Sequence, residues 1–126
     1  MSVLEDLLYS KDHEWAKLDG NIVTVGITDH AQKQLGDIVF VELPEPDDEV
    51  TKGEPFGSVE STKAVSDCFA PATGRVTEVN ELLADNPETI NSDPYGAGWL
   101  MKFEISDRSE LDDLLSAEEY EKLLQE

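Results

Sequence analysis

A short lysine-bearing turn between two strand-like segments most constrains how this chain can fold. Residues 57–61 and 65–69 alternate small, β-branched and polar side chains. That composition favours half-buried strands over a helix. Lys63 stands between them, flanked by Thr62 and Ala64, which add no bulky apolar group. The pattern predicts a β-hairpin that holds the amine of Lys63 out at its tip, as a handle to which another group can be attached.

Strand signals recur along the chain and predict a mainly β protein. Asp-Gly-Asn at residues 19–21 separates two strand-like runs, as a hairpin turn does. Further strands are expected at residues 38–43, 75–80 and 99–105. The proline-rich segment 44–49 between them cannot continue a central strand. Loops are expected around residues 86–87 and 91–96, where Asn and Pro gather.

Helical signals are limited to short segments at the start, inside and at the end of the chain. Two short acidic and apolar turns open the chain within residues 1–10. Thr28 suits the N-cap of a helix that continues through Leu35, and Gly36 is placed to end that helix in a left-handed conformation.

Two capping-box spacings predict helical turns at about residues 109–125. Ser109 precedes Asp112 by three residues, and Ser116 precedes Glu119 by three. Apolar residues follow at helical spacing, and we expect them to pack on the β domain, with a binding face for a partner helix as the alternative. This stripe consists of Leu111, Leu114, Leu115, Tyr120, Leu123 and Leu124.

The charge balance excludes some partners and suggests others. The chain has nine lysines and arginines and 29 aspartates and glutamates, which gives a formal net charge of -20. Nucleic acids and anionic membranes would repel such a chain, so its partners are expected to be proteins. The acids are spread over the whole sequence, and their mutual repulsion is relieved by salt. We therefore hypothesise a salt-rich cytoplasm, with adaptation to basic partner surfaces as the alternative.

Length and cysteine content indicate one cytoplasmic domain. The 126 residues suffice for a single modest core. Cys68 is the only cysteine, which rules out an intrachain disulfide, and we expect it to be a small core residue. No apolar run approaches the length of a membrane span, and acids replace the basic start of a signal peptide. These features predict a prokaryotic cytoplasmic protein.

The segment around Lys63 resembles the lipoylation loop of the glycine cleavage system H-protein family. Biotin carriers usually place methionines on both sides of the modified lysine, whereas this chain has Thr62 and Ala64 there. An ordinary surface lysine is the alternative for Lys63, but the similarity extends through five blocks in the family's order. These blocks are residues 9–15, 25–31, 35–44, 57–67 and 90–96.

The resemblance implies the fold in some detail. It implies a single lipoyl-carrier domain over residues 1–126, mainly β, built as a flattened barrel-sandwich hybrid of two antiparallel sheets. The barrel would cover about residues 15–105. Short N-terminal and internal helices and a C-terminal helical segment would complete it.

The resemblance also implies a carrier function. Lipoate would be bound as an amide to Lys63, and the arm would carry the aminomethyl group of glycine from the pyridoxal phosphate-dependent glycine decarboxylase to an aminomethyltransferase. Dihydrolipoamide dehydrogenase would reoxidise it, and a lipoylating enzyme would attach it. An H-like relay that donates lipoate to 2-oxoacid dehydrogenases is the alternative, and an unmodified interaction module is a third possibility.

Further site residues follow from the same resemblance. Glu60 and Gly74 match positions associated with recognition by the lipoylating enzyme. Asp12, Glu14 and Asp67 match or adjoin the surface cleft in which the family shelters the loaded arm, where a carboxylate would pair with its cationic amine. A solvated surface charge is the alternative for Glu60, and a plain turn glycine for Gly74.

Aromatic and histidine residues near these blocks each allow more than one role. Trp15 is expected in the core, with an apolar wall of the cleft as the alternative. Whether His13 or His30 faces the arm stays open, and two isolated histidines make a metal site improbable. Catalysis is not expected. Ser61 lacks a nucleophile-elbow pattern, and the acidic neighbours Glu60 and Asp67 disfavour the neutral amine that a nucleophilic Lys63 would need.

Overall fold

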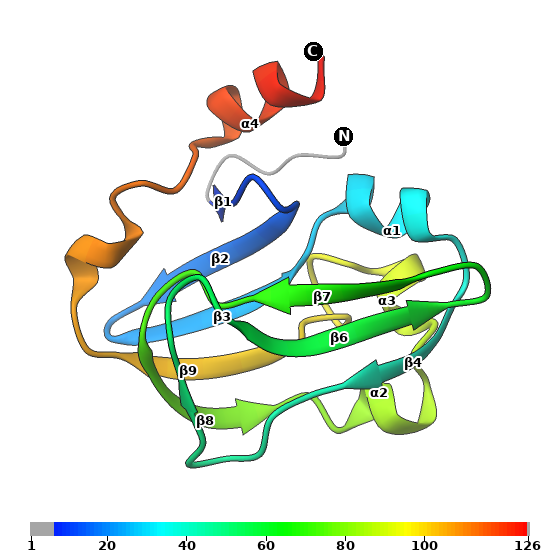
Figure 1. Ribbon diagram of the computed structural model, residues 1–126, viewed down its shortest axis with the longest axis horizontal. Coiled ribbons are helices and arrows are strands. Elements are labelled where there is room, and N and C mark those ends of the chain that lie inside the picture. The colour runs from blue at the N-terminus through cyan, green and yellow to red at the C-terminus, as the bar shows by residue number, and fades with distance from the viewer. Residues whose placement is uncertain (1–6, 126) are drawn as a thin grey trace.

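Two antiparallel sheets form the protein, as predicted, in a computed structural model that describes residues 7–125 (Figure 1). The six-stranded sheet has the order β1 (Leu8–Tyr9), β2 (Glu14–Asp19), β3 (Ile22–Ile27), β9 (Met101–Ile105), β8 (Gly74–Val79) and β5 (Glu49–Val50). The three-stranded sheet has the order β4 (Ile38–Glu42), β6 (Pro55–Ser61) and β7 (Val65–Phe69).

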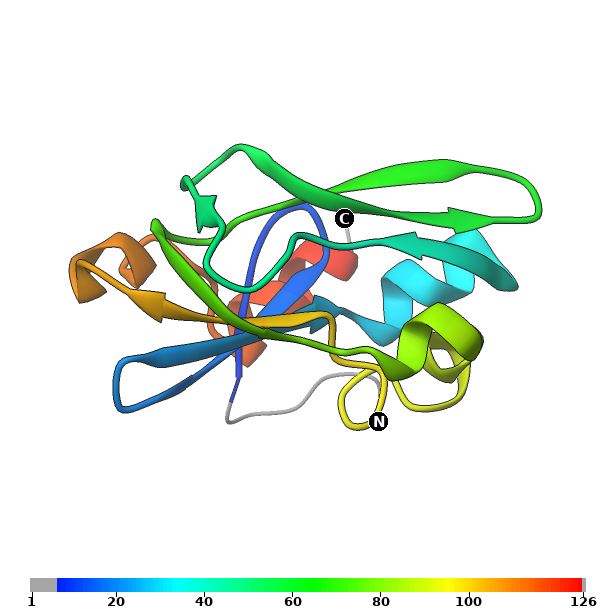
Figure 2. The same cartoon turned by 90° about the horizontal axis from the view of Figure 1, so that it is seen from below.

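The two sheets lie as layers over one apolar core (Figure 2). Inward-facing side chains from both sheets, such as Val25, Val59 and Phe103, are fully buried. Cys68 is buried among them, as predicted. The small sheet therefore has one face on the core and one face on solvent, because successive side chains in a strand alternate in direction.

The predicted turns and strands are largely confirmed. Asp19 pairs with Ile22 across the β2–β3 turn, where Gly20 adopts a φ of 62°. The last strand begins two residues later than expected, because Leu100 donates its N–H to Val25 as an isolated contact before the regular β3–β9 ladder starts.

Helix α1 (Asp29–Leu35) also forms as predicted. The hydroxyl of Thr28 accepts a hydrogen bond from the backbone N–H of Ala31 at 3.2 Å, which caps the helix start. Gly36 ends the helix with a φ of 82° and donates its N–H to the carbonyl of Gln32. This end of α1 leads directly into β4 (Figure 1).

Two short helices that were not predicted, α2 (Leu82–Asp85) and α3 (Thr89–Ser92), lie on either side of the expected loop at residues 86–87. The loop prediction for residues 91–96 is therefore wrong at its first two positions. Long-range contacts hold α3, since the side-chain amide of Asn91 donates to the carbonyl of Gly36 and accepts from the N–H of Ile38. Local sequence patterns do not predict contacts between residues so far apart in the chain.

The C-terminal segment confirms one capping box and not the other. Ser116 and Glu119 form both hydrogen bonds of a capping box at the start of α4 (Ala117–Leu124). Ser109 does not cap a helix. It lies inside the 3-10 helix η1 (Arg108–Leu111), whose cap is Asp107, because that carboxylate accepts hydrogen bonds from both the N–H and the hydroxyl of Ser109.

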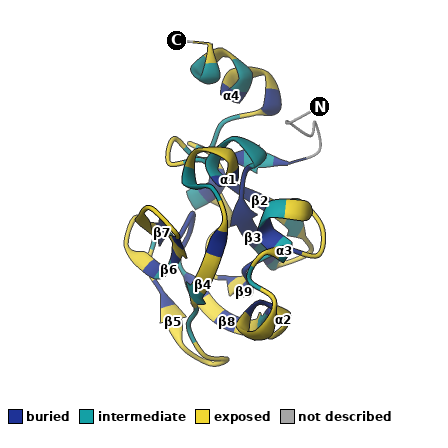
Figure 3. Cartoon of the chain, turned by 90° about the vertical axis from the view of Figure 1, so that its right-hand side faces the viewer, coloured by how far each residue is buried: buried dark blue, intermediate teal, exposed yellow. Residues whose placement is uncertain are grey.

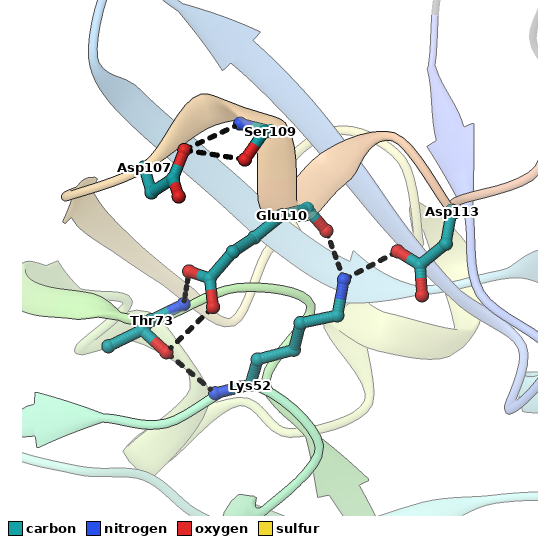
Figure 4. Close-up of polar contacts among 6 residues, drawn as sticks. All are labelled: Lys52, Thr73, Asp107, Ser109, Glu110 and Asp113. Atoms are coloured by element: carbon teal, nitrogen blue, oxygen red, sulfur yellow. Dashed lines mark hydrogen bonds and ion pairs between the residues drawn. The ribbon is translucent and has the colours of Figure 1, made fainter.

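Helix η1 is tied to the barrel by a group of polar contacts (Figure 4). The Lys52 amine donates to the backbone carbonyl of Glu110 and pairs with the carboxylate of Asp113. The Glu110 carboxylate in turn accepts from the N–H of Thr73 at 2.8 Å and from its hydroxyl at 3.2 Å. These contacts fix the path of the chain between the last strand and α4.

Helix α4 packs on the body of the protein, which confirms the predicted role of the apolar stripe. Tyr120 is fully buried and stacks on Tyr9, with ring centroids 4.6 Å apart. Leu115, Leu123 and Leu124 pack in the same cluster, whereas Leu111 and Leu114 belong to the main core.

The expected N-terminal turns fall mostly on residues 1–6, which lie outside the described residues. At the next positions the chain forms strand β1. None of the helices in the range 7–125 combines the length and the apolar character that crossing a membrane requires.

Candidate functional site

Lys63 is exposed in the turn between β6 and β7, as predicted (Figure 1). The buried Ser61 organises this turn. Its N–H donates to the carbonyl of Ala64 at 2.8 Å, and its hydroxyl accepts from the N–H groups of Lys63 and Ala64 at 3.3 and 3.1 Å. The Ser61 hydroxyl is thus engaged with the backbone of its own turn, in agreement with a structural role.

The end of α1 supports the same turn from the side. The N–H of Thr62 donates to the carbonyl of Asp37 at 3.1 Å. A Cβ placed on Gly36 would lie 3.6 Å from Cε of Lys63, so the lysine stem runs beside this helix end. The turn is therefore held from two directions, while the amine of Lys63 remains at the surface. Such an arrangement can present a covalent attachment to another protein.

Glu14 is buried where β2 meets the free edge of β7. One carboxylate oxygen accepts from the N–H of Phe69 at 2.6 Å, and the other accepts from the Ser10 hydroxyl at 3.1 Å. Burial raises the pKa of Glu14 to about 7, against the lowering effect of these two hydrogen bonds. A carboxyl group with this pKa changes its charge near neutral pH.

Asp12 and Asp67 are exposed, and Asp12 lies close to Glu14. The charge of Asp12 raises the pKa of Glu14 further. Asp67 precedes Phe69 by two residues on β7 and is exposed. Glu14 and Asp67 both add to the effect of burial, which raises the pKa of the Cys68 thiol. Asp12 and Glu14 thus lie together, and Asp67 is on the strand that Glu14 contacts, while their role toward an arm stays a prediction.

The predicted lysine and the buried carboxylate Glu14 lie near opposite ends of the segment that runs from the turn through β7. Lys63 and Phe69, whose N–H binds Glu14, are six positions apart along the turn and strand. At roughly 3.3 Å per residue the separation approaches 20 Å. Glu14 therefore lies far from the bare amine and nearer to the reach of a longer attached arm, whereas Asp67 is only four positions from Lys63.

The two histidines form a pair that also contacts the C-terminal helix. The rings of His13 and His30 are 4.7 Å apart, and Nδ1 of His13 is hydrogen-bonded to the hydroxyl of Tyr120 at 2.8 Å. That hydroxyl also contacts the Thr28 hydroxyl at 2.7 Å. Burial and then His30 lower the pKa of His13, whereas Asp12 raises it. Sequence analysis missed this role of Tyr120, which its place in an apolar stripe does not signal.

Trp15 is a core residue, as predicted. It is only 3% exposed, and its indole N–H donates to the carbonyl of Pro94 at 2.9 Å. The indole lies directly over Gly26, because a Cβ at that glycine would come within 2.6 Å of the ring. Trp15 therefore does not form an exposed apolar wall of the cleft.

The two predicted recognition residues lie in different surroundings. Glu60 is exposed on β6, three residues before Lys63. Gly74 is buried at the start of β8, at the end of the barrel away from the Lys63 turn (Figure 1). A Cβ there would lie 2.2 Å from the carbonyl oxygen of Glu104 and 2.6 Å from the Phe103 ring. Strand packing therefore requires this glycine, whatever its role in recognition.

We expect Gly74→Ala to destabilise the protein by about 2 kcal/mol, because the added methyl group forces β8 away from β9. Urea unfolding of the variant beside Gly53→Ala, whose Cβ meets nothing within 4 Å, measures this cost. Gly53 has a φ of 83° and Gly74 has no positive φ, so the Gly53 variant measures backbone strain without crowding and the Gly74 variant measures crowding without that strain. Equal stability of Gly74→Ala and the wild type would contradict the packing explanation.

Comparisons with known proteins agree with this geometry. The family model described as "Glycine cleavage H-protein" matches residues 7–126. The chain belongs to the glycine cleavage H-protein family. It is 60% identical to the glycine cleavage system H protein of Carboxydothermus hydrogenoformans, over 100% of this chain and 98% of that protein. It is 57% identical to that of Staphylococcus haemolyticus, with both chains fully covered.

A solved structure supports the family assignment in three dimensions. The glycine cleavage system H protein of Mycobacterium marinum superimposes with a TM-score of 0.87 at 44% identity, covering 98% of this chain and 100% of that one. As a glycine cleavage H protein, the chain is a carrier subunit and not an enzyme. The predicted fold and carrier class are thereby confirmed.

Proposed function

We propose that this H protein carries lipoate as an amide on Lys63 and moves the aminomethyl group of glycine between enzymes. The observation that carries the proposal is the turn itself, in which Ser61 and the end of α1 hold the backbone while the amine stays exposed. A bound dithiolane supplies the disulfide and thiol chemistry that accepts and releases the one-carbon unit. The chain supplies the position of the arm.

The proposed partners are the enzymes that act on the arm in turn. They are glycine decarboxylase, the aminomethyltransferase and dihydrolipoamide dehydrogenase, together with the lipoylating enzyme. Tethering raises the local concentration of the reacting group at each active site without any catalytic side chain on the carrier. The acidic surface, with a net charge of -20, favours partners that present basic residues around their active-site entrances.

We further propose that Asp12, Glu14 and Asp67 shelter the loaded arm. A primary amine is cationic at neutral pH, and Glu14 has its pKa near 7 by burial, so a nearby cation would favour its ionised form. Pairing would release a proton from Glu14 below pH 7 and would become stronger as the pH rises. The exposed Asp12 and Asp67 would add negative potential at the cleft entrance.

Reconstitution with glycine decarboxylase tests this function. Lipoylated protein should support exchange of bicarbonate with the carboxyl group of glycine, and the unmodified protein should not. A lipoylated chain that supports no exchange but donates lipoate to 2-oxoacid dehydrogenase subunits would establish the relay function instead.

A salt-rich native cytoplasm also remains a proposal, and thermal melts test it. Screening of the 29 acids should relieve about 1 kcal/mol or more of repulsion and raise the melting midpoint by roughly 4 °C between low and molar KCl. The alternative is that the acidity serves basic partner surfaces, in which case the fold needs no high salt. A midpoint that does not rise with KCl would remove the salt-adaptation hypothesis.

A further inference from the structure

Apolar side chains cluster unexpectedly on the solvent face of the small sheet. Four large apolar residues are strongly exposed among the described residues, and three of them lie on β4 and β7, beside the Lys63 turn. Val39 is 48% exposed, Phe40 54% and Val65 64%. Much of β4 and of the β6–β7 hairpin is accordingly coloured as exposed in Figure 3. The fourth residue, Leu82, belongs to α2.

Strand register gathers these side chains into one row. Phe40 pairs with Glu60, and Glu60 pairs with Val65. Residues that pair directly across strands point to the same face, so Phe40 and Val65 flank Glu60. A bulge between Ile38 and Phe40 leaves Val39 exposed beside them. This row is the last one before the turn that carries Lys63.

The next row on the same face is acidic. Glu42, Ser58 and Asp67 pair across the three strands, and they line a hollow of about 230 Å³ on this face. Next to Lys63, apolar side chains flank the exposed carboxylate of Glu60, and two further carboxylates lie in the row behind. This combination complements a protein surface that has apolar recesses bordered by arginine or lysine. Core packing does not explain the apolar row, because all three of its side chains point to solvent.

We propose that this face, defined by Val39, Phe40, Val65, Glu42 and Asp67, is the docking surface for the lipoylating enzyme. The proposal rests on the proposed function, in which Lys63 is the lipoyl site. An enzyme that acylates the bare amine must bring its active site within one lysine side chain of the turn. It therefore covers the adjacent row, whereas an enzyme that acts on the end of a finished arm works at a greater distance.

Lipoylation kinetics test the docking surface. Phe40→Ser and Val65→Thr, singly and together, are compared with the wild type as substrates of a bacterial lipoate–protein ligase supplied with lipoate and ATP. The ligase joins lipoate to the α-phosphate of ATP as an acyl-adenylate, with pyrophosphate as the leaving group. The Lys63 amine then attacks the acyl carbon, and the amide bond forms as AMP leaves and the amine loses a proton. We expect kcat/KM for the carrier to fall about tenfold per variant and about a hundredfold for the pair, with KM for ATP unchanged.

Matched controls separate docking from folding. Val65→Thr keeps a β-branched side chain on its strand, and Leu82→Ser removes an equally exposed apolar group from α2 and should be lipoylated at the wild-type rate. Unchanged melting midpoints of the variants establish that the fold is intact.

Each remaining outcome decides a different point. Wild-type lipoylation of the double variant would overturn the docking surface and leave Lys63 as the attachment site. Normal lipoylation combined with lost glycine exchange would assign the face to an enzyme that uses the arm, which overturns the proposed occupant. Failure of the wild type to accept lipoate would instead overturn the proposed function.

Discussion

Lys63→Arg should abolish glycine exchange while leaving the fold unchanged. The side chain is exposed, and the hydrogen bonds that build its turn come from backbone groups and from Ser61, so arginine can occupy the position. Arginine keeps the positive charge but cannot be converted into the amide that holds the arm. Without a tether the carrier loses the whole gain in local concentration at each partner enzyme. Bicarbonate exchange with glycine decarboxylase should fall to background.

The matched control is Lys17→Arg, which changes an exposed lysine on β2 in the same way. It should keep full exchange activity and take up lipoate normally. If Lys63→Arg supports more exchange than glycine decarboxylase does without any carrier protein, another residue carries the arm.

Glu14→Gln should remove one contribution to the pH dependence of the protein's free energy of unfolding. Glu14 has a pKa of about 7 in the folded protein and 4.5 as a free side chain. The folded state thus favours the protonated form, a contribution that is complete below pH 4.5 and is lost as the pH rises through 7. A difference of this size corresponds to about 3 kcal/mol. Glutamine cannot ionise, yet its carbonyl can still accept from the N–H of Phe69.

Urea unfolding between pH 4.5 and 8.5 measures this effect. Relative to the wild type, the variant should gain about 3 kcal/mol of unfolding free energy between the two ends of the range. Glu104→Gln, an exposed change of the same charge on β9, corrects for the general effect of lowering the net charge. Parallel curves for the wild type and Glu14→Gln would show that burial does not shift this carboxyl group.

Local patterns predicted the elements whose determinants are local. Thr28 and Gly36 mark both ends of α1, and Ser116 with Glu119 marks the start of α4, because capping uses residues three or four positions apart. The hairpin at Lys63 likewise follows from alternation and a small turn. Helix α3 was missed because Asn91 is held by partners more than 50 residues away.

The features of the site likewise divide into those that local sequence predicts and those that depend on distant contacts. The exposure of Lys63 follows from its place at a hairpin tip, which the sequence shows directly. The raised pKa of Glu14 depends on its burial in the folded protein, where its carboxylate meets the N–H of Phe69, 55 residues away. The contact of His13 with Tyr120 spans 107 residues. For Ser109, the prediction chose the wrong cap because the carboxylate of Asp107, two residues earlier, accepts from the N–H and the hydroxyl of Ser109 and starts the helix there.

Intact and peptide mass spectrometry of the protein, isolated from its native cells or coexpressed with a lipoate ligase, tests the central claim most directly. The account predicts a single lipoyl-sized increase in mass, located on the peptide that contains Lys63 and absent from Lys63→Arg. An unmodified Lys63, under conditions that lipoylate a known carrier, would contradict the account and favour an interaction module. A biotin-sized increase at Lys63 would contradict it in favour of a carboxylase carrier.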